Sequence, residues 1–156
     1  MIEINNKFLT GRTYIDLFCG IGGFHLALSS FGANCIFASD INKDAQISYK
    51  KNFGIQPFGD ITKIAVQDIP PHDILCAGFP CQPFSISGNQ QGFEDEQGRG
   101  RLFFNIIDII HEHHPQMVLL ENVKNLEKHN GGNTLSRIRT ELENEGYSVF
   151  HSILCA

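Results

Sequence analysis

Short apolar runs alternate with stretches of helical periodicity along the whole chain, and this alternation limits the folds that the chain can adopt. Strands are expected at residues 13–18, 34–39, 73–77, 116–121 and 147–154. A sixth, shorter extended piece leads into residues 59–62. Helices are expected where apolar side chains recur at spacings of three and four, at residues 22–31, 42–53, 101–113 and 134–145. Such alternation predicts an α/β, Rossmann-like fold, a mostly parallel sheet with helices on both faces.

Length and composition fit one cytoplasmic domain. The chain has 156 residues, of which 42% are hydrophobic and 19% charged, which suits a single domain with its own core. It shows no export signal, and no apolar run approaches the roughly 18 residues of a membrane span. The five cysteines are odd in number and lack C-x-x-C spacing, and His111-Glu-His-His114 matches no metal-binding template. Neither a disulfide framework nor a metal site is expected.

Cofactor-binding residues are expected where the strands end, because ligands of parallel α/β sheets bind beyond the carboxyl ends of the strands. The first strand leads into Phe18-Cys-Gly-Ile-Gly-Gly-Phe24, whose glycines allow a sharp turn and the close approach of a ligand. Asp40 follows at a spacing typical of an acid that binds ribose hydroxyls. The glycine spacing departs from G-x-G-x-x-G, which favours a nucleoside without a pyrophosphate. A tight turn with a capping acid is the structural alternative.

Three later positions carry further candidate groups. Asp60 is placed to reach the adenine of a bound nucleoside, although Gly59-Asp-Ile-Thr62 also suits a plain turn. Cys81 lies between two prolines that fix the backbone, and its thiol needs activation to act as a nucleophile. Glu121 ends an apolar strand, where burial would raise the pKa of its carboxyl and let it donate a proton to a ring nitrogen. A surface acid is the alternative for Glu121.

Together these segments resemble the DNA (cytosine-5)-methyltransferases of bacterial restriction–modification systems. The matching segments keep the family's order and cover nearly the whole chain; they are Asp16–Phe24, Asp40, Gly59–Asp60, Gly78–Ser85, Gly100–Phe103 and Glu121–Val123. The resemblance implies the methyltransferase form of the fold with S-adenosylmethionine as cofactor. The residues that it assigns to the cofactor are Phe18, Gly20, Gly22, Gly23, Asp40, Ile41, Asp60, Ile61 and Leu102. Asp40 would bind the ribose and Asp60 the adenine.

For catalysis the resemblance implies that Cys81 adds to C6 of a cytosine flipped out of duplex DNA while Glu121 donates to N3. C5 then takes the methyl group. The resemblance also assigns Pro80 and Asn122, which flank these two groups, to the catalytic site. Residues 79–100 are similar to a family loop that closes on DNA, in which the DNA-contacting residues would be Gln82, Ser85, Ser87 and Arg99.

The chain is shorter than the family's proteins. The resemblance implies that residues 1–156 are the N-terminal part of the catalytic domain, truncated after the sixth strand. The target recognition domain would then lie in a missing C-terminal segment or a complementary chain. The net charge of −5 agrees, because a surface that binds DNA is normally basic. We expect the chain alone to be inactive, or nearly so, on DNA.

Two other functions stay open. A non-catalytic remnant would bind a nucleoside or S-adenosylmethionine without turnover. An RNA cytosine-5 methyltransferase would share the Pro-Cys-Gln element, but Phe79 and the bacterial-type loop favour DNA.

Overall fold

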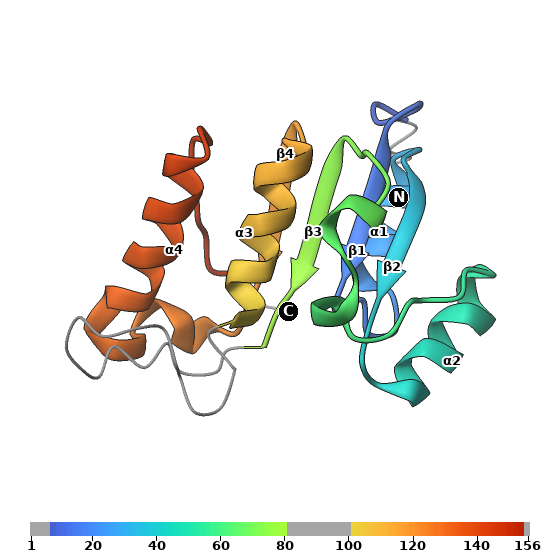
Figure 1. The fold of residues 1–156 in the computed structure, drawn as a ribbon, viewed down its shortest axis with the longest axis horizontal. Coiled ribbons are helices and arrows are strands. Elements are labelled where there is room, and N and C mark those ends of the chain that lie inside the picture. The colour runs from blue at the N-terminus through green and yellow to red at the C-terminus, as the bar shows by residue number, and fades with distance from the viewer. Residues whose placement is uncertain (1–6, 81–100, 155–156) are drawn as a thin grey trace.

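In the part of the chain that the structure describes, four parallel strands form a sheet in the order β2-β1-β3-β4 (Figure 1). The computed structural model describes residues 7–80 and 101–154. The strands are β1 (Thr13–Leu17), β2 (Asn34–Ser39), β3 (Ile74–Gly78) and β4 (Met117–Glu121). The helices are α1 (Gly23–Ser30), α2 (Lys43–Phe53), α3 (Arg101–His113) and α4 (Asn133–Asn144). Short 3₁₀ turns are η1 (Ile61–Lys63), η2 (Val66–Asp68), η3 (Lys124–Glu127) and η4 (His129–Gly132).

The sheet buries a separate apolar layer on each face. Tyr14 of β1 packs with Leu28 of α1 and Tyr49 of α2 on one face. Ile15, the next residue of β1, packs on the other face with α3, through side chains such as Ile106. Successive side chains of a strand point to opposite faces, so a strand buried on both faces must be apolar almost throughout. The expected parallel sheet with helices on both faces is confirmed.

Local sequence explains where the helices begin and end. Asn42 caps α2, since its side-chain oxygen accepts hydrogen bonds from the backbone N–H groups of Asp44 and Ala45 at 2.9 and 3.1 Å. Gly32 follows α1 with a φ of 91°, which suits glycine. α3 has one strongly apolar face, on which Ile106, Ile109 and Ile110 are buried. No helix of the described ranges, α3 included, is long and apolar enough to cross a membrane.

Two of the expected extended pieces do not become strands of the sheet. The piece before Gly59 makes a single bridge, between Phe58 and Ser39. The expected strand at 147–154 is wrong, because this segment pairs with no strand among the described residues. Side chains bind it instead: Arg139 donates to the carbonyl oxygen of Val149 at 2.9 Å, and the Tyr147 hydroxyl donates to that of Pro115 at 2.6 Å. The described sheet therefore ends at β4.

Candidate cofactor and catalytic site

The carboxyl ends of the four strands place the candidate residues in one row. Leu17 of β1 pairs with Ser39 of β2 and Ala77 of β3, and Gly78 of β3 pairs with Glu121 of β4. Because the strands are parallel, the residues that follow them emerge at the same edge of the sheet. In sheet order this edge carries Asp40, the turn Phe18–Gly23, Pro80 and Glu121.

The turn between β1 and α1 is tight on its inner side and open on its outer side. Phe18, Gly20 and Gly22 have φ angles of 56, 53 and 99°. At Gly22 a Cβ atom would clash with the ring of Phe53, so glycine is required there. At Gly20 and Gly23 a Cβ atom would meet nothing within 4 Å. The turn therefore leaves room for a ligand beside the first turn of α1.

Asp40 joins this turn to the start of α2. Its Oδ2 accepts a hydrogen bond from the backbone N–H of Gly20, and its Oδ1 accepts one from that of Asn42, each at 2.8 Å. An ionised carboxylate offers about four acceptor positions, so each oxygen can still accept from a ligand hydroxyl. Ile41, next in the chain, is 71% exposed and can cover an apolar ring. Asp40 thus holds the turn and the start of α2 together and keeps free acceptor capacity.

Asp60 caps the 3₁₀ turn η1, as expected on local grounds. It accepts hydrogen bonds from the hydroxyl of Thr62 at 2.8 Å and from its backbone N–H at 3.0 Å. These bonds, that from the hydroxyl first, hold the pKa of the Asp60 carboxyl below its usual value. The side chain of Ile61 is buried in the core, so its backbone is the part that can face a ligand. Contact between this turn and an adenine ring stays a prediction.

A side-chain hydrogen bond joins the ends of β3 and β4. The amide of Asn122 donates to the carbonyl oxygen of Phe79 at 2.8 Å, while its oxygen accepts from the backbone N–H of Val123 at 2.9 Å. The Phe79 ring is buried against Phe103 of α3, with ring centres 5.8 Å apart, and the next residue, Pro80, is exposed. The chain therefore leaves the sheet at Pro80 from a fixed position.

Several predicted residues lie outside the described ranges. Cys81, the expected nucleophile, directly follows Pro80, and the expected DNA contacts Gln82, Ser85, Ser87 and Arg99 lie further along the same undescribed segment. Leu102, expected at the cofactor, lies half-buried in the first turn of α3.

The side chain of Glu121 lies beside Gly78 and is exposed to solvent. One of its carboxylate oxygens is 3.5 Å from the position that a Cβ atom on Gly78 would take. The expectation that its side chain is buried is wrong, since the structure leaves it exposed. The physical reason is that β4 is the outer strand of the described sheet, so no neighbouring strand covers its end.

A buried polar cluster behind the glycine turn was not expected from the sequence. It consists of Asp16 in β1, His25 in α1 and Tyr49 in α2, with exposed fractions of 1, 8 and 0%. Burial raises the pKa of Asp16 to about 7, and burial also lowers the pKa of His25. The one signal in the sequence is an acid inside the apolar run of residues 13–18.

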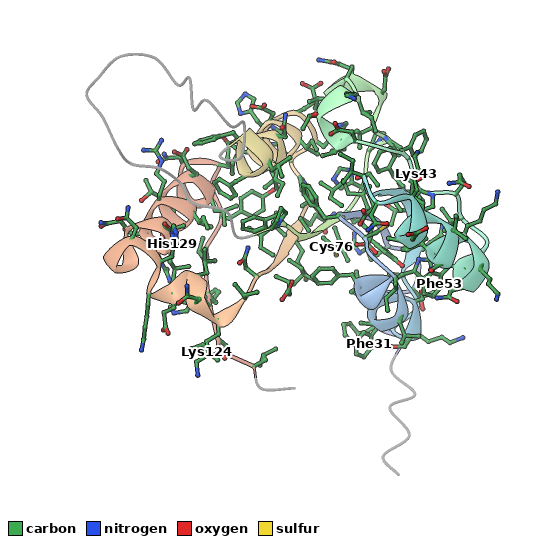
Figure 2. All side chains as sticks on the ribbon, turned by 90° about the horizontal axis from the view of Figure 1, so that it is seen from below. Phe31, Lys43, Phe53, Cys76, Lys124 and His129 are labelled. Atoms are coloured by element: carbon green, nitrogen blue, oxygen red, sulfur yellow. The ribbon has the colours of Figure 1, made fainter. Side chains whose placement is uncertain are left out.

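The thiols of Cys35 and Cys76 lie near this cluster. Together with Cys19 they are buried, and burial raises the pKa of all three thiols. In Figure 2 Cys76 lies near the centre of the molecule. His111 of the His-rich stretch lies 3.0 Å from a carboxylate oxygen of Glu145. Within residues 7–80 and 101–154 no group of three His, Cys, Asp or Glu side chains is placed to hold a metal ion.

Comparison with known proteins identifies the family. Residues 12–156 match the family described as C-5 cytosine-specific DNA methylase. The chain belongs to this family. It is 53% identical, over all of its 156 residues, to the type II methyltransferase M.HhaI of Haemophilus parahaemolyticus, of which it covers 47%. It is 48% identical to M.MspI of Moraxella sp. over 154 residues, which are 99% of this chain and 37% of that relative.

Solved structures of methyltransferases share the fold of this methylase-family chain. The S. pombe Dnmt2 methyltransferase aligns with a TM-score of 0.67 and 28% identity, over 85% of this chain and 42% of that one. A putative DNA modification methyltransferase from an E. coli prophage aligns with a TM-score of 0.65 at 23% identity, which supports the fold alone. The chain thus spans less than half the length of the relatives named here.

Proposed function

We propose that this chain is the cofactor- and nucleophile-bearing part of a DNA cytosine-5 methyltransferase that uses S-adenosylmethionine. One observation carries the proposal. The glycine turn, the residues that lead to Cys81, and Glu121 emerge from three neighbouring strands at one edge of the sheet. Cofactor, nucleophile and proton donor would then meet at one place, as methyl transfer between two bound molecules requires.

The described residues fit the proposed cofactor. The open space over Gly20 and Gly23 admits the methionine part of the molecule beside the N-terminal end of α1, where helix N–H groups favour a carboxylate. The remaining lone pairs of Asp40 suit the two ribose hydroxyls. Exposed Ile41 would pack on the adenine. When bound, S-adenosylmethionine supplies an activated methyl group on a sulfonium.

The chain's own residues would make the cytosine reactive. The Cys81 thiolate forms a bond to C6, and electrons of the C5–C6 double bond shift into the ring as Glu121 gives a proton to N3. C5 then takes the methyl group, and S-adenosylhomocysteine is left. N3 then returns its proton to Glu121, and loss of the C5 proton to solvent restores the C5–C6 double bond and expels the thiolate. The cytosine must leave the helix to reach these groups, at a cost of a few kcal/mol.

Glu121 is exposed at the end of β4, and in the proposed enzyme a further segment along β4 covers it. Along its outer side β4 pairs with no strand of the described residues. A cavity of about 860 Å³ adjoins it, lined by side chains that include Val118, Leu120, Leu126 and Ile138. Since the chain spans 47% of M.HhaI, we propose that a C-terminal segment or a complementary chain covers this side and supplies DNA recognition.

Methyl transfer separates this function from that of a cofactor-binding remnant. We compare the purified chain with a fusion in which the C-terminal part of M.HhaI follows residue 156, and measure methyl groups incorporated into duplex DNA. The proposal expects incorporation by the fusion and little or none by the chain alone. Binding of the cofactor by both, without incorporation by the fusion, would instead support a non-catalytic remnant.

A further inference from the structure

Three side chains from three elements meet in the core directly behind the glycine turn. The Nδ1 atom of His25 lies 2.8 Å from the Tyr49 hydroxyl, which donates a longer hydrogen bond, 3.4 Å, to Oδ2 of Asp16. When the hydroxyl gives its one proton to Asp16, Nδ1 of His25 is the donor of the first bond. The hydrogen bonds then run in one direction, from α1 through α2 to β1.

The same contacts hold the start of α1 against α2. His25 is in the first turn of α1, and its ring stacks on Phe53 of α2 with ring centres 3.9 Å apart. The Phe53 ring also occupies the space beside Gly22, as the missing room for a Cβ atom there indicates. Phe53 is labelled in Figure 2, where α1 and α2 lie next to each other. A shift of α2 would therefore move the glycine turn.

Burial of the Asp16 carboxyl is unfavourable for the free energy of folding. Its Oδ1 has no hydrogen-bond partner of good geometry among the described residues. The groups that face it are the Tyr49 hydroxyl and the backbone of His25 from the two helices, and Tyr14 from its own strand. The thiols of Cys19, Cys35 and Cys76 face it from the turn and the neighbouring strands. Asp40 acts on it with a charge of the same sign. An acid buried among neutral groups is expensive for folding, and a role in the adjoining turn accounts for it.

We propose that Asp16, Tyr49 and His25 are positioning residues, and that their hydrogen-bonded chain fixes the Gly20–Gly23 turn relative to Asp40. The Gly20 N–H that Asp40 binds belongs to that turn. The three hydrogen-bonded side chains therefore set the distance between the turn and Asp40, the two parts of the proposed cofactor site. The inference rests on the proposed function in that the turn is taken to bind S-adenosylmethionine.

Ionisation of Asp16 gives this arrangement a pH dependence. With its pKa raised to about 7 by burial, Asp16 is neutral below that pH and charged above it. A charge there favours any opening of the α1–α2 layer that lets water reach the carboxylate. We expect the turn to be held less firmly, and the cofactor more weakly, at pH 8 than at pH 6.

Two tyrosines provide a matched test. Tyr49→Phe removes the hydroxyl that links Asp16 to His25 and keeps the ring. Tyr14→Phe is the control: Tyr14 is as fully buried on the same face, but its hydroxyl contacts Ser29 and the carbonyl oxygen of His25. Asp16→Asn is a second variant, with a similar shape and no ionisation. For each we measure hydrogen exchange of the Gly20–His25 amides without ligand, and the Kd for S-adenosylhomocysteine, at pH 6 and pH 8.

Tyr49→Phe is expected to lower the protection of these amides, and to raise the Kd, about tenfold more than Tyr14→Phe does. A tenfold change corresponds to the loss of roughly one hydrogen bond. Asp16→Asn is expected to lose the difference between pH 6 and pH 8. Equal losses in the two tyrosine variants, or an unchanged pH difference in Asp16→Asn, would overturn the positioning role. If the unmodified chain fails to bind S-adenosylhomocysteine, the proposed function fails, and amide exchange alone decides the positioning role.

Discussion

The side-chain amide of Asn122 donates a 2.8 Å hydrogen bond to the carbonyl oxygen of Phe79, and this bond ties the end of β4 to the chain that leads to Cys81. Glu121, the proposed proton donor, precedes Asn122 directly. Asn122 therefore fixes the end of β4, next to Glu121, against Phe79, which lies two residues before Cys81 in the sequence.

Loss of this bond should affect catalysis more than cofactor binding. In the M.HhaI fusion we expect Asn122→Ala to lower kcat about tenfold, because one net hydrogen bond is worth about 1 kcal/mol and small errors of position are costly. The Kd for S-adenosylhomocysteine should change less than about twofold, since the cofactor turn lies on β1. Asn125→Ala, at an exposed position of η3, is the control. Equal effects of the two substitutions on kcat would contradict this role.

Asp40 should govern cofactor affinity. Asp40→Ala removes two acceptors from the ribose and releases the Gly20 N–H, so we expect the Kd for S-adenosylhomocysteine to rise roughly 10- to 100-fold by calorimetry. Asp44→Ala, which removes an exposed acid from the first turn of α2, should leave the Kd within about twofold. An unchanged affinity in Asp40→Ala would exclude the ribose assignment.

The two glycines that flank the start of α1 should respond differently to alanine. Gly22 has a φ of 99° and no room beside Phe53, so Gly22→Ala should destabilise the protein by about 2–4 kcal/mol. Gly23 is helical with open space around its Cβ position, so Gly23→Ala should be neutral or slightly stabilising. Thermal unfolding of both variants measures the difference. Similar melting temperatures would show that the turn is not packed as described.

Asp16 should make stability fall as the pH rises. In the unfolded chain its carboxyl loses the proton near pH 4, whereas in the folded protein its raised pKa keeps the proton up to about pH 7. The folded state therefore binds the extra proton between these values, and its stability falls by up to about 1.4 kcal/mol per pH unit there.

Denaturant unfolding from pH 4.5 to 8 checks this slope. The difference between the unmodified chain and Asp16→Asn isolates the contribution of Asp16, and the exposed Asp68→Asn serves as control. The prediction fails if Asp16→Asn and the unmodified chain show the same pH dependence.

Strand ends and the glycine turn could be predicted from the sequence because they depend on local patterns. Phe18–Gly23 needs glycines for its backbone angles, and Asp40 follows a strand whose apolar residues mark it clearly. Asn42 could likewise be predicted as a cap, since its side chain binds N–H groups two and three residues further along.

Features that depend on distant partners could not be predicted. Residues 147–154 have the pattern of a strand, but a strand also needs a neighbour with free backbone groups, and Arg139 binds the backbone here instead. The exposure of Glu121 depends on what covers β4. The cluster of Asp16, His25 and Tyr49 joins three segments that only the packing of α1 and α2 on β1 brings together.

Covalent capture of DNA tests the central claim most directly. The M.HhaI fusion is mixed with S-adenosylmethionine and duplex DNA that carries 5-fluorocytosine at the target base, where fluorine at C5 prevents release of the thiolate. Mass spectrometry then locates the adduct. The account predicts an adduct on Cys81 that is lost in Cys81→Ser and retained in Cys155→Ser. An adduct that persists in Cys81→Ser, or that maps to another residue, would contradict it.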